Sequence, residues 1–172
     1  MPDEISSDYN QLKKAINLCA SFLILRGSTI YFVHLSAKDF LLKNVSEILF
    51  PCGTEEVSGV VFSRSIEAMS ALHRDMYGLC APGIGISEVK EPDSNPLASI
   101  GYSCEYWIDH LCEWHSRANT DASNSLQDGG QVDKFLRTKF LYWLEALSLL
   151  RSMSQGVYSI IKLEGLLQVS VF

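Results

Sequence analysis

The 172 residues of the chain show two kinds of hydrophobic pattern. Residues 22–25 and 30–33 are short runs of apolar, aromatic and β-branched residues, and the turn between them, residues 26–29, contains glycine. This arrangement predicts a β-hairpin. Elsewhere apolar residues recur every three or four positions, which is typical of amphipathic helices. The pattern therefore predicts a mainly α fold that contains one β-hairpin.

Capping signals place a helix on each side of this hairpin. Asp8, with Gln11 three residues later, predicts the start of a short helix before the first strand. Ser36, with Asp39 three residues later, has the same spacing and predicts the N-cap of a helix after the second strand. An isolated hairpin is only marginally stable and must pack on a helix. Helix, hairpin and helix in this order form the closing part of a winged helix, and His34 lies just before the second cap.

The rest of the chain predicts a bundle of about four helices. The first begins at Thr54, after the break Pro51-Cys52-Gly53, and ends near Gly78. The second begins at Asn95-Pro96, which is typical of an N-cap followed by proline at the first helical position. The expected buried positions are Val57, Val60, Val61, Ala68, Leu72 and Met76 in the first helix, Leu97, Ile100, Cys104, Trp107, Ile108, Leu111 and Trp114 in the second, and Val132, Phe135, Leu136, Phe140, Trp143, Leu144, Leu147 and Leu150 in the third.

The third helix is expected over residues 132–153 with Gly156 ending it, and a fourth over 157–167. A Pro/Gly-rich connector at 81–96 and a polar loop at 117–131 separate the helices. This gives two parts in total. Residues 1–50 form a winged-helix remnant, and residues 51–172 form a helical bundle.

Composition and charge exclude several classes of protein. The net charge is −6, and lysine and arginine form no basic stripe, which argues against nucleic acid or a membrane surface as a partner. No run approaches the roughly 18 apolar residues of a membrane span. Five scattered cysteines without a secretory signal favour reduced thiols and a cytoplasmic location. The chain is expected to be soluble.

Five segments, taken together and in order, carry a resemblance to a known family. They are NLCASFLILR at 17–26, YFVHLSAKDFL at 31–41, RDMYGL with APG at 74–83, YSCEYWIDHL at 102–111, and KFLYWLEALSL at 139–149. In this order they resemble fungal NACHT-domain (STAND-type) NTPases of the vegetative-incompatibility type, over nearly the whole chain. The matching region of those proteins lies between the nucleotide-binding core and the C-terminal repeats.

This resemblance implies a role. Such proteins are signalling NTPases, and the matching region couples the nucleotide state of the core to a repeat sensor in self/non-self recognition or programmed cell death. By resemblance, His34 is the winged-helix histidine that reaches the phosphates of a bound diphosphate and holds the resting form. The implied partners are the NACHT core and the repeat domain of the parent protein, and the implied nucleotide of that parent is ATP/ADP or GTP/GDP.

The chain itself contains no G-x-x-x-x-G-K-[ST] sequence, so we expect it to be nonenzymatic and to bind no cofactor alone. An alternative function is a stand-alone helical adaptor that binds a protein through an apolar groove between the helices of residues 97–153. Size-exclusion chromatography would distinguish the two functions, because a coupling segment separated from its other domains would self-associate, whereas an adaptor would be monomeric.

Several residues also have simpler interpretations. His34 can be a local hydrogen-bonding residue at a strand end. Cys104, His110, Cys112 and His115 are zinc-ligand types, but their spacing on one helix points them in different directions. Ser-His-Asp catalysis has little support, because the chain has no G-x-S-x-G sequence.

Overall fold

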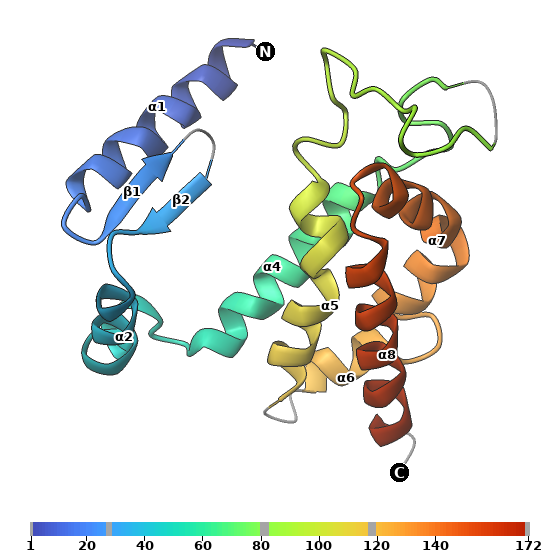
Figure 1. Ribbon diagram of the computed structural model, residues 1–172. Helices are drawn as coiled ribbons and strands as arrows, with labels where there is room; N and C mark the ends of the chain where they lie inside the picture. The colour runs from blue at the N-terminus through green and yellow to red at the C-terminus, as the bar shows by residue number, and fades with distance from the viewer. Residues whose placement is uncertain (1, 27–28, 80–82, 117–119, 171–172) are drawn as a thin grey trace. The chain divides into compact units, whose positions relative to one another are not determined.

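The computed structural model describes residues 2–26, 29–79, 83–116 and 120–170. The chain divides into two compact units, Met1–Gly53 and Thr54–Phe172. Helices dominate the described residues, and one two-stranded antiparallel sheet accompanies them (Figure 1). The expectation of a mainly α fold with one β-hairpin is therefore confirmed.

The first unit has the expected order of helix, hairpin and helix. Leu23 pairs with Phe32 and Arg26 with Thr29, so the strands lie one residue from the predicted runs. A short third helix follows a break at Val45. The elements are α1 (Pro2–Leu18), β1 (Leu23–Arg26), β2 (Thr29–Phe32), α2 (Leu35–Asn44) and α3 (Ser46–Leu49).

The first helix is longer than expected. It runs for 17 residues from Pro2, so Asp8 lies within α1 and the prediction that Asp8 begins a short helix is wrong. Proline is tolerated in the first helical turn, where its missing N–H has no helical partner in any case. The residues between Pro2 and Asp8 contain no glycine or further proline, so nothing interrupts the helix before the expected start.

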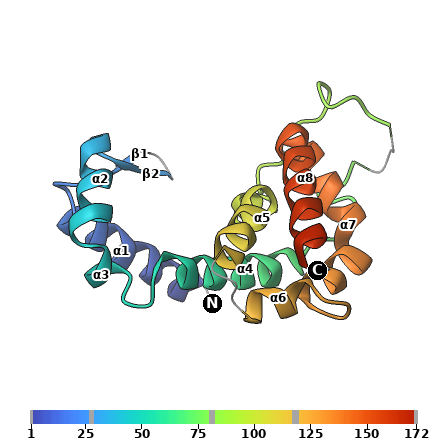
Figure 2. The same ribbon diagram turned by 90° about the horizontal axis from the view of Figure 1, so that it is seen from below.

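The second unit is a helical bundle with an aromatic core. Figures 1 and 2 show α5 between α4 and α8. Trp107 on α5 is at the centre of the core, because its ring centroid lies 6.3 Å from that of Phe62, 5.2 Å from that of Phe135 and 5.8 Å from that of Trp143. The elements are α4 (Thr54–Met69), α5 (Gly101–His115), α6 (Thr120–Leu126), α7 (Gln131–Leu149) and α8 (Met153–Ser170).

The buried faces of α5 and α7 follow the sequence pattern. All seven residues expected on the second helical face are buried, from Leu97 to Trp114. Of the α7 stripe, Val132, Phe135, Trp143 and Leu147 are buried, and the other four residues are half-buried against the same core. The facing sides of α5 and α7 are thus filled by their own side chains, chiefly Trp107 and Trp143, in the region where the adaptor alternative places a groove.

The buried face of α4 differs from the prediction. Val57 and Val60 are exposed, whereas Ser58, Gly59, Phe62, Ser65 and Met69 are buried. Ser58 Oγ donates a hydrogen bond of 2.7 Å to Glu113 Oε2 on α5, so the serine is buried without losing its hydrogen bond. Small residues face α5 because the two helices are in close contact.

The predicted end of the first bundle helix and the predicted start of the second are both wrong. α4 ends at Met69, not near Gly78, and the following segment contains Asp75 and Gly78 at φ of 58° and 64°. Asn95 Oδ1 does accept a hydrogen bond from Leu97 N at 2.8 Å, as expected of a cap, but it caps only a turn, and α5 begins at Gly101.

The C-terminal helices also depart from the expected boundaries. α7 ends at Leu149, and Arg151, at φ 59°, separates it from α8. Gly156 lies inside α8, in contact with the side chain of Leu147, so it does not end a helix. Part of the expected polar loop at 117–131 is the helix α6, whose Ala122 and Leu126 are buried in the core.

Candidate functional site

His34 occupies the junction between the hairpin and α2. It is the N-cap residue of α2, with extended backbone at φ −148° and ψ 148°. Ser36 N donates to His34 Nδ1 at 3.2 Å, and Ser36 Oγ lies 2.8 Å from the same nitrogen. The prediction of Ser36 as N-cap with Asp39 as its partner is therefore wrong, because the imidazole nitrogen accepts the hydrogen bond that a serine or aspartate oxygen usually accepts.

This cap determines which ring nitrogen of His34 carries the proton. A neutral imidazole has one N–H donor and one acceptor, so a ring that accepts at Nδ1 carries its proton on Nε2. The side chain is exposed, and the hydrogen bonds described for it all involve Nδ1. His34 thus presents an Nε2–H donor to its surroundings, as binding to an anionic oxygen requires.

The backbone around His34 is well supported. Val33 N donates to Phe22 O at 2.8 Å, which extends the hairpin ladder to the residue before the histidine. On the other side, the rings of Phe22 and Phe40 stack at a centroid distance of 6.3 Å with an interplanar angle of 7°, which ties α2 to the start of the hairpin. These two contacts place His34 between the hairpin and α2.

The first unit leaves most of its apolar side chains uncovered. Among the side chains described in it, those of residues 10–26 and 30–53, Ile16 is the one buried hydrophobic side chain, at 5% exposure. A depression of about 440 Å³ lies between α1 and the hairpin. A unit of this size needs far more buried apolar surface to be stable alone. The exposed large hydrophobic residues are Leu12, Leu18, Ile24, Ile30, Tyr31, Phe32, Val33, Leu35, Phe40, Leu42, Ile48 and Leu49.

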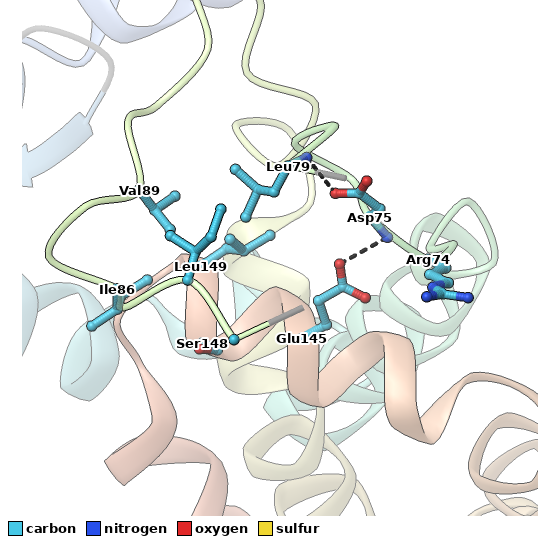
Figure 3. A pocket seen from close by; sticks show the side chains of 10 residues that line it. Arg74, Asp75, Leu79, Ile86, Val89, Glu145, Ser148 and Leu149 are labelled. Carbon is cyan, nitrogen blue, oxygen red and sulfur yellow. Dashed lines mark hydrogen bonds between the residues drawn. The ribbon is translucent and has the colours of Figure 1, made fainter. Parts of the chain in front are cut away.

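The second unit contains a pocket of about 550 Å³ between α7 and the segment that joins α4 to α5 (Figure 3). Asp75 N donates to Glu145 Oε1 at 2.8 Å, and Leu79 N donates to Asp75 Oδ1 at 2.6 Å. The sequence did not predict this pocket, because the prolines and glycines of residues 81–96 indicate only an irregular link. The third and fifth segments of the family resemblance, at 74–83 and 139–149, both contribute residues to the pocket. Their joint presence in the resemblance could have indicated that the two segments are in contact.

His110, Cys104 and Cys112 on α5 lie in surroundings that disfavour metal binding. His110 Nε2 lies 2.8 Å from Tyr102 Oη. Burial raises the pKa of the Cys104 thiol to about 12, and burial also raises the pKa of the Cys112 thiol. Both thiols are therefore protonated at neutral pH, and the protonated form is a poor metal ligand. Within the described ranges, no three or more His, Cys, Asp or Glu residues are grouped as a metal site.

In the part of the chain that the structure describes, no helix combines the length and the apolar character needed to span a bilayer.

The chain is homologous to part of a much longer fungal protein of the vegetative-incompatibility type. That relative is vegetative incompatibility protein HET-E-1 from Podospora anserina, to which the chain is 49% identical over 180 aligned positions. The alignment covers 97% of this chain but 13% of the relative. No family model matches the chain, and no solved structure matches it. The resemblance expected from the five segments is confirmed by this homologue.

Proposed function

We propose that this chain is the coupling segment of a fungal NACHT-type signalling NTPase and performs no catalysis of its own. The observation that carries the proposal is the exposed His34 at the end of the hairpin, whose Nδ1 accepts from Ser36 N as the N-cap of α2, which leaves Nε2 as its donor. The 49% identity to an incompatibility protein supports the same assignment, and so does the absence of a phosphate-binding loop from the sequence.

In this mechanism the NACHT core of the parent protein holds ATP/ADP or GTP/GDP, and His34 donates from Nε2 to a phosphate oxygen of the diphosphate. A hydrogen bond to a charged group is worth about 1.5–3 kcal/mol, which shifts a two-state equilibrium roughly tenfold or more. The uncovered apolar side chains of the first unit pack on that core, and the helical bundle transmits the resulting state to the repeat sensor.

A chimera of HET-E-1 tests the proposal. The homologous region of that protein is replaced by this chain, and the incompatibility reaction is scored with and without a genetically incompatible partner strain. We expect a regulated reaction from the chimera. His34→Ala should give a reaction without the partner, because the resting form loses its hydrogen bond to the diphosphate.

A second variant separates the phosphate contact from the helix cap. Asparagine is among the best N-cap residues but is too short to replace the outward imidazole N–H, so His34→Asn should give the same unprovoked reaction with α2 intact. Lys38→Ala, an exposed position one turn further along α2, is the matched control and should remain regulated. Normal regulation in His34→Asn would contradict the phosphate role. Normal regulation with a Gly/Ser linker in place of the chain would contradict the coupling role.

A further inference from the structure

The pocket of the second unit has an apolar end and an acidic end. In Figure 3, Leu79, Val89 and Leu149 gather at the apolar end, and Glu145 and Asp75 lie beside one another at the other. Arg74 also lines the pocket, at the polar end and on the side away from the apolar side chains. The ligand that fits therefore has an aliphatic part and a polar part.

The acidic end has unused hydrogen-bonding capacity. Glu145 is half-buried, and its Oε1 accepts the hydrogen bond from Asp75 N. Its second carboxylate oxygen makes no hydrogen bond or ion pair to any described residue. A cation placed against a half-buried carboxylate is bound more strongly than one in open solvent, because the effective dielectric constant is lower there.

The net charge of the second unit is negative, like that of the Glu145 carboxylate. Residues 54–172 contain fifteen acidic against nine basic residues, whereas residues 1–53 contain five of each. The whole net charge of −6 therefore belongs to the bundle. A surface of one sign attracts ligands of the other, so the bundle favours the approach of a basic ligand.

The wall of the pocket is held in place before any ligand binds. Lys139 Nζ donates to Leu72 O at 2.7 Å, and Arg151 Nη2 donates to Ile86 O at 3.5 Å. With the hydrogen bond between Asp75 and Glu145, these contacts attach the segment between α4 and α5 to α7 and its C-terminal turn at three places. A pre-formed wall lowers the entropy that a ligand loses on binding.

We propose that this pocket receives a lysine or arginine side chain from another protein segment. The aliphatic stem lies against Leu79, Val89 and Leu149, and the cationic head reaches the free oxygen of Glu145. The pocket is open to solvent along one side, so a free small molecule would remain partly exposed, whereas a protein segment covers the opening with its own backbone. Long basic side chains commonly pair an apolar stem contact with a charged tip in this way.

The test is an NMR titration of the complete ¹⁵N-labelled chain with three blocked tripeptides, acetyl-Ala-Lys-Ala-amide and its norleucine and glutamate counterparts. Norleucine keeps the aliphatic stem and lacks the ammonium group. We expect the lysine peptide to shift the amide signals of Asp75, Glu145 and Leu149, with an affinity at least tenfold above that of the norleucine peptide.

Glu145→Gln identifies the charged contact. Its amide oxygen can still accept from Asp75 N, so the segment between α4 and α5 stays attached to α7. Far-UV circular dichroism and the unshifted signals of α5 would verify this. This variant should bind the lysine peptide no better than the norleucine peptide. Glu164→Gln, an exposed acid on α8, is the control and should bind like the unsubstituted chain.

Three results would overturn the proposal. Equal affinity for the lysine and norleucine peptides would make the pocket an apolar site only. Preferred binding of the glutamate peptide, lost in Arg74→Gln, would make it an anion site. Absence of any shift at Asp75, Glu145 and Leu149 would show that the pocket binds none of these side chains.

Discussion

A single missing side-chain carbon sets the distance between α4 and α5. A Cβ added at Gly59 would lie 2.7 Å from both Cε2 and Nε1 of Trp114, closer than real Cβ contacts allow. Trp114 is buried and its ring lies 5.7 Å from that of Phe62, so it has little room to move. Gly59→Ala should therefore destabilise the bundle by about 1–3 kcal/mol, the usual cost of overpacking. Urea unfolding followed by circular dichroism measures this change.

Gly165→Ala is the matched control on α8. A Cβ there meets no heavy atom within 4 Å, so the substitution should raise the free energy of unfolding by up to about 1 kcal/mol through helix propensity alone. Equal effects of the two substitutions would contradict the close packing of α4 on α5.

Residue by residue, hydrophobic periodicity predicted the apolar core of α5 and α7 well and that of α4 poorly. The rule looks for large apolar side chains, whereas close helix contact selects small ones, and so Ser58 and Gly59 were missed in favour of Val57 and Val60. His34 was found as a candidate because of its position after the hairpin. Its role as a cap was not predictable, because imidazole is an unusual N-cap acceptor.

Among the helices, the start of α7 has a charge-dependent cap. Asp133 Oδ2 accepts from Gly129 N at 2.9 Å, and Oδ1 accepts from Arg137 Nε at 2.6 Å. The hydrogen bond from Gly129, and then the one from Arg137, hold the pKa of the Asp133 carboxyl below its ordinary value of 3.8. A carboxyl with a lowered folded-state pKa contributes stability above its unfolded pKa and loses it as the pH falls through the folded value.

Asp133→Asn should therefore reduce the free energy of unfolding at pH 7, and the difference from the unsubstituted chain should shrink as the pH falls below about 3.8. Urea unfolding at a series of pH values from 7 to 2.5 measures this difference. Asp128→Asn, an exposed acid in the same turn, should give no such pH-dependent difference. A difference for Asp133→Asn that is constant over the series would exclude the carboxylate charge as its cause.

Helix existence was predictable for the long periodic segments, and helix ends were not. α4 ends at Met69, six residues before Asp75 takes left-handed backbone, and α7 ends at Leu149, two residues before Arg151 does so. Neither residue type signals this conformation in advance. α6 was missed because seven residues rich in serine and asparagine look like a loop, and only contact with the core, through Ala122 and Leu126, makes them helical.

At the scale of the whole molecule, the two units should differ greatly in stability. The second unit buries a continuous aromatic and aliphatic core, whereas Ile16 is the one buried hydrophobic side chain described in the first. Amide hydrogen exchange of the complete chain should show strong protection in α5 and α7 and little in α1, α2 and the hairpin. Equal protection in both units would show that the apolar residues of the first unit are covered in solution, against our proposal that another domain covers them.

The fold class, the family relation and the pocket differ in how far the sequence predicts them. Hydrophobic periodicity alone predicted a mainly α fold with one hairpin. The relation to incompatibility proteins came from five ordered segments and required the homologue to confirm it. The pocket was not predictable, because it forms where the segment after α4 folds back onto α7. No local sequence pattern predicts a contact between segments so far apart in the chain.

The uneven placement of charge has a practical consequence for anyone handling this protein. Contacts made through the first unit, which has no net charge and exposes apolar side chains, are insensitive to screening by salt and strengthen in sulfate. Electrostatic contacts made through the acidic second unit weaken as salt is added. A simple series of sodium chloride and ammonium sulfate concentrations therefore tells which half of the molecule holds any assembly together.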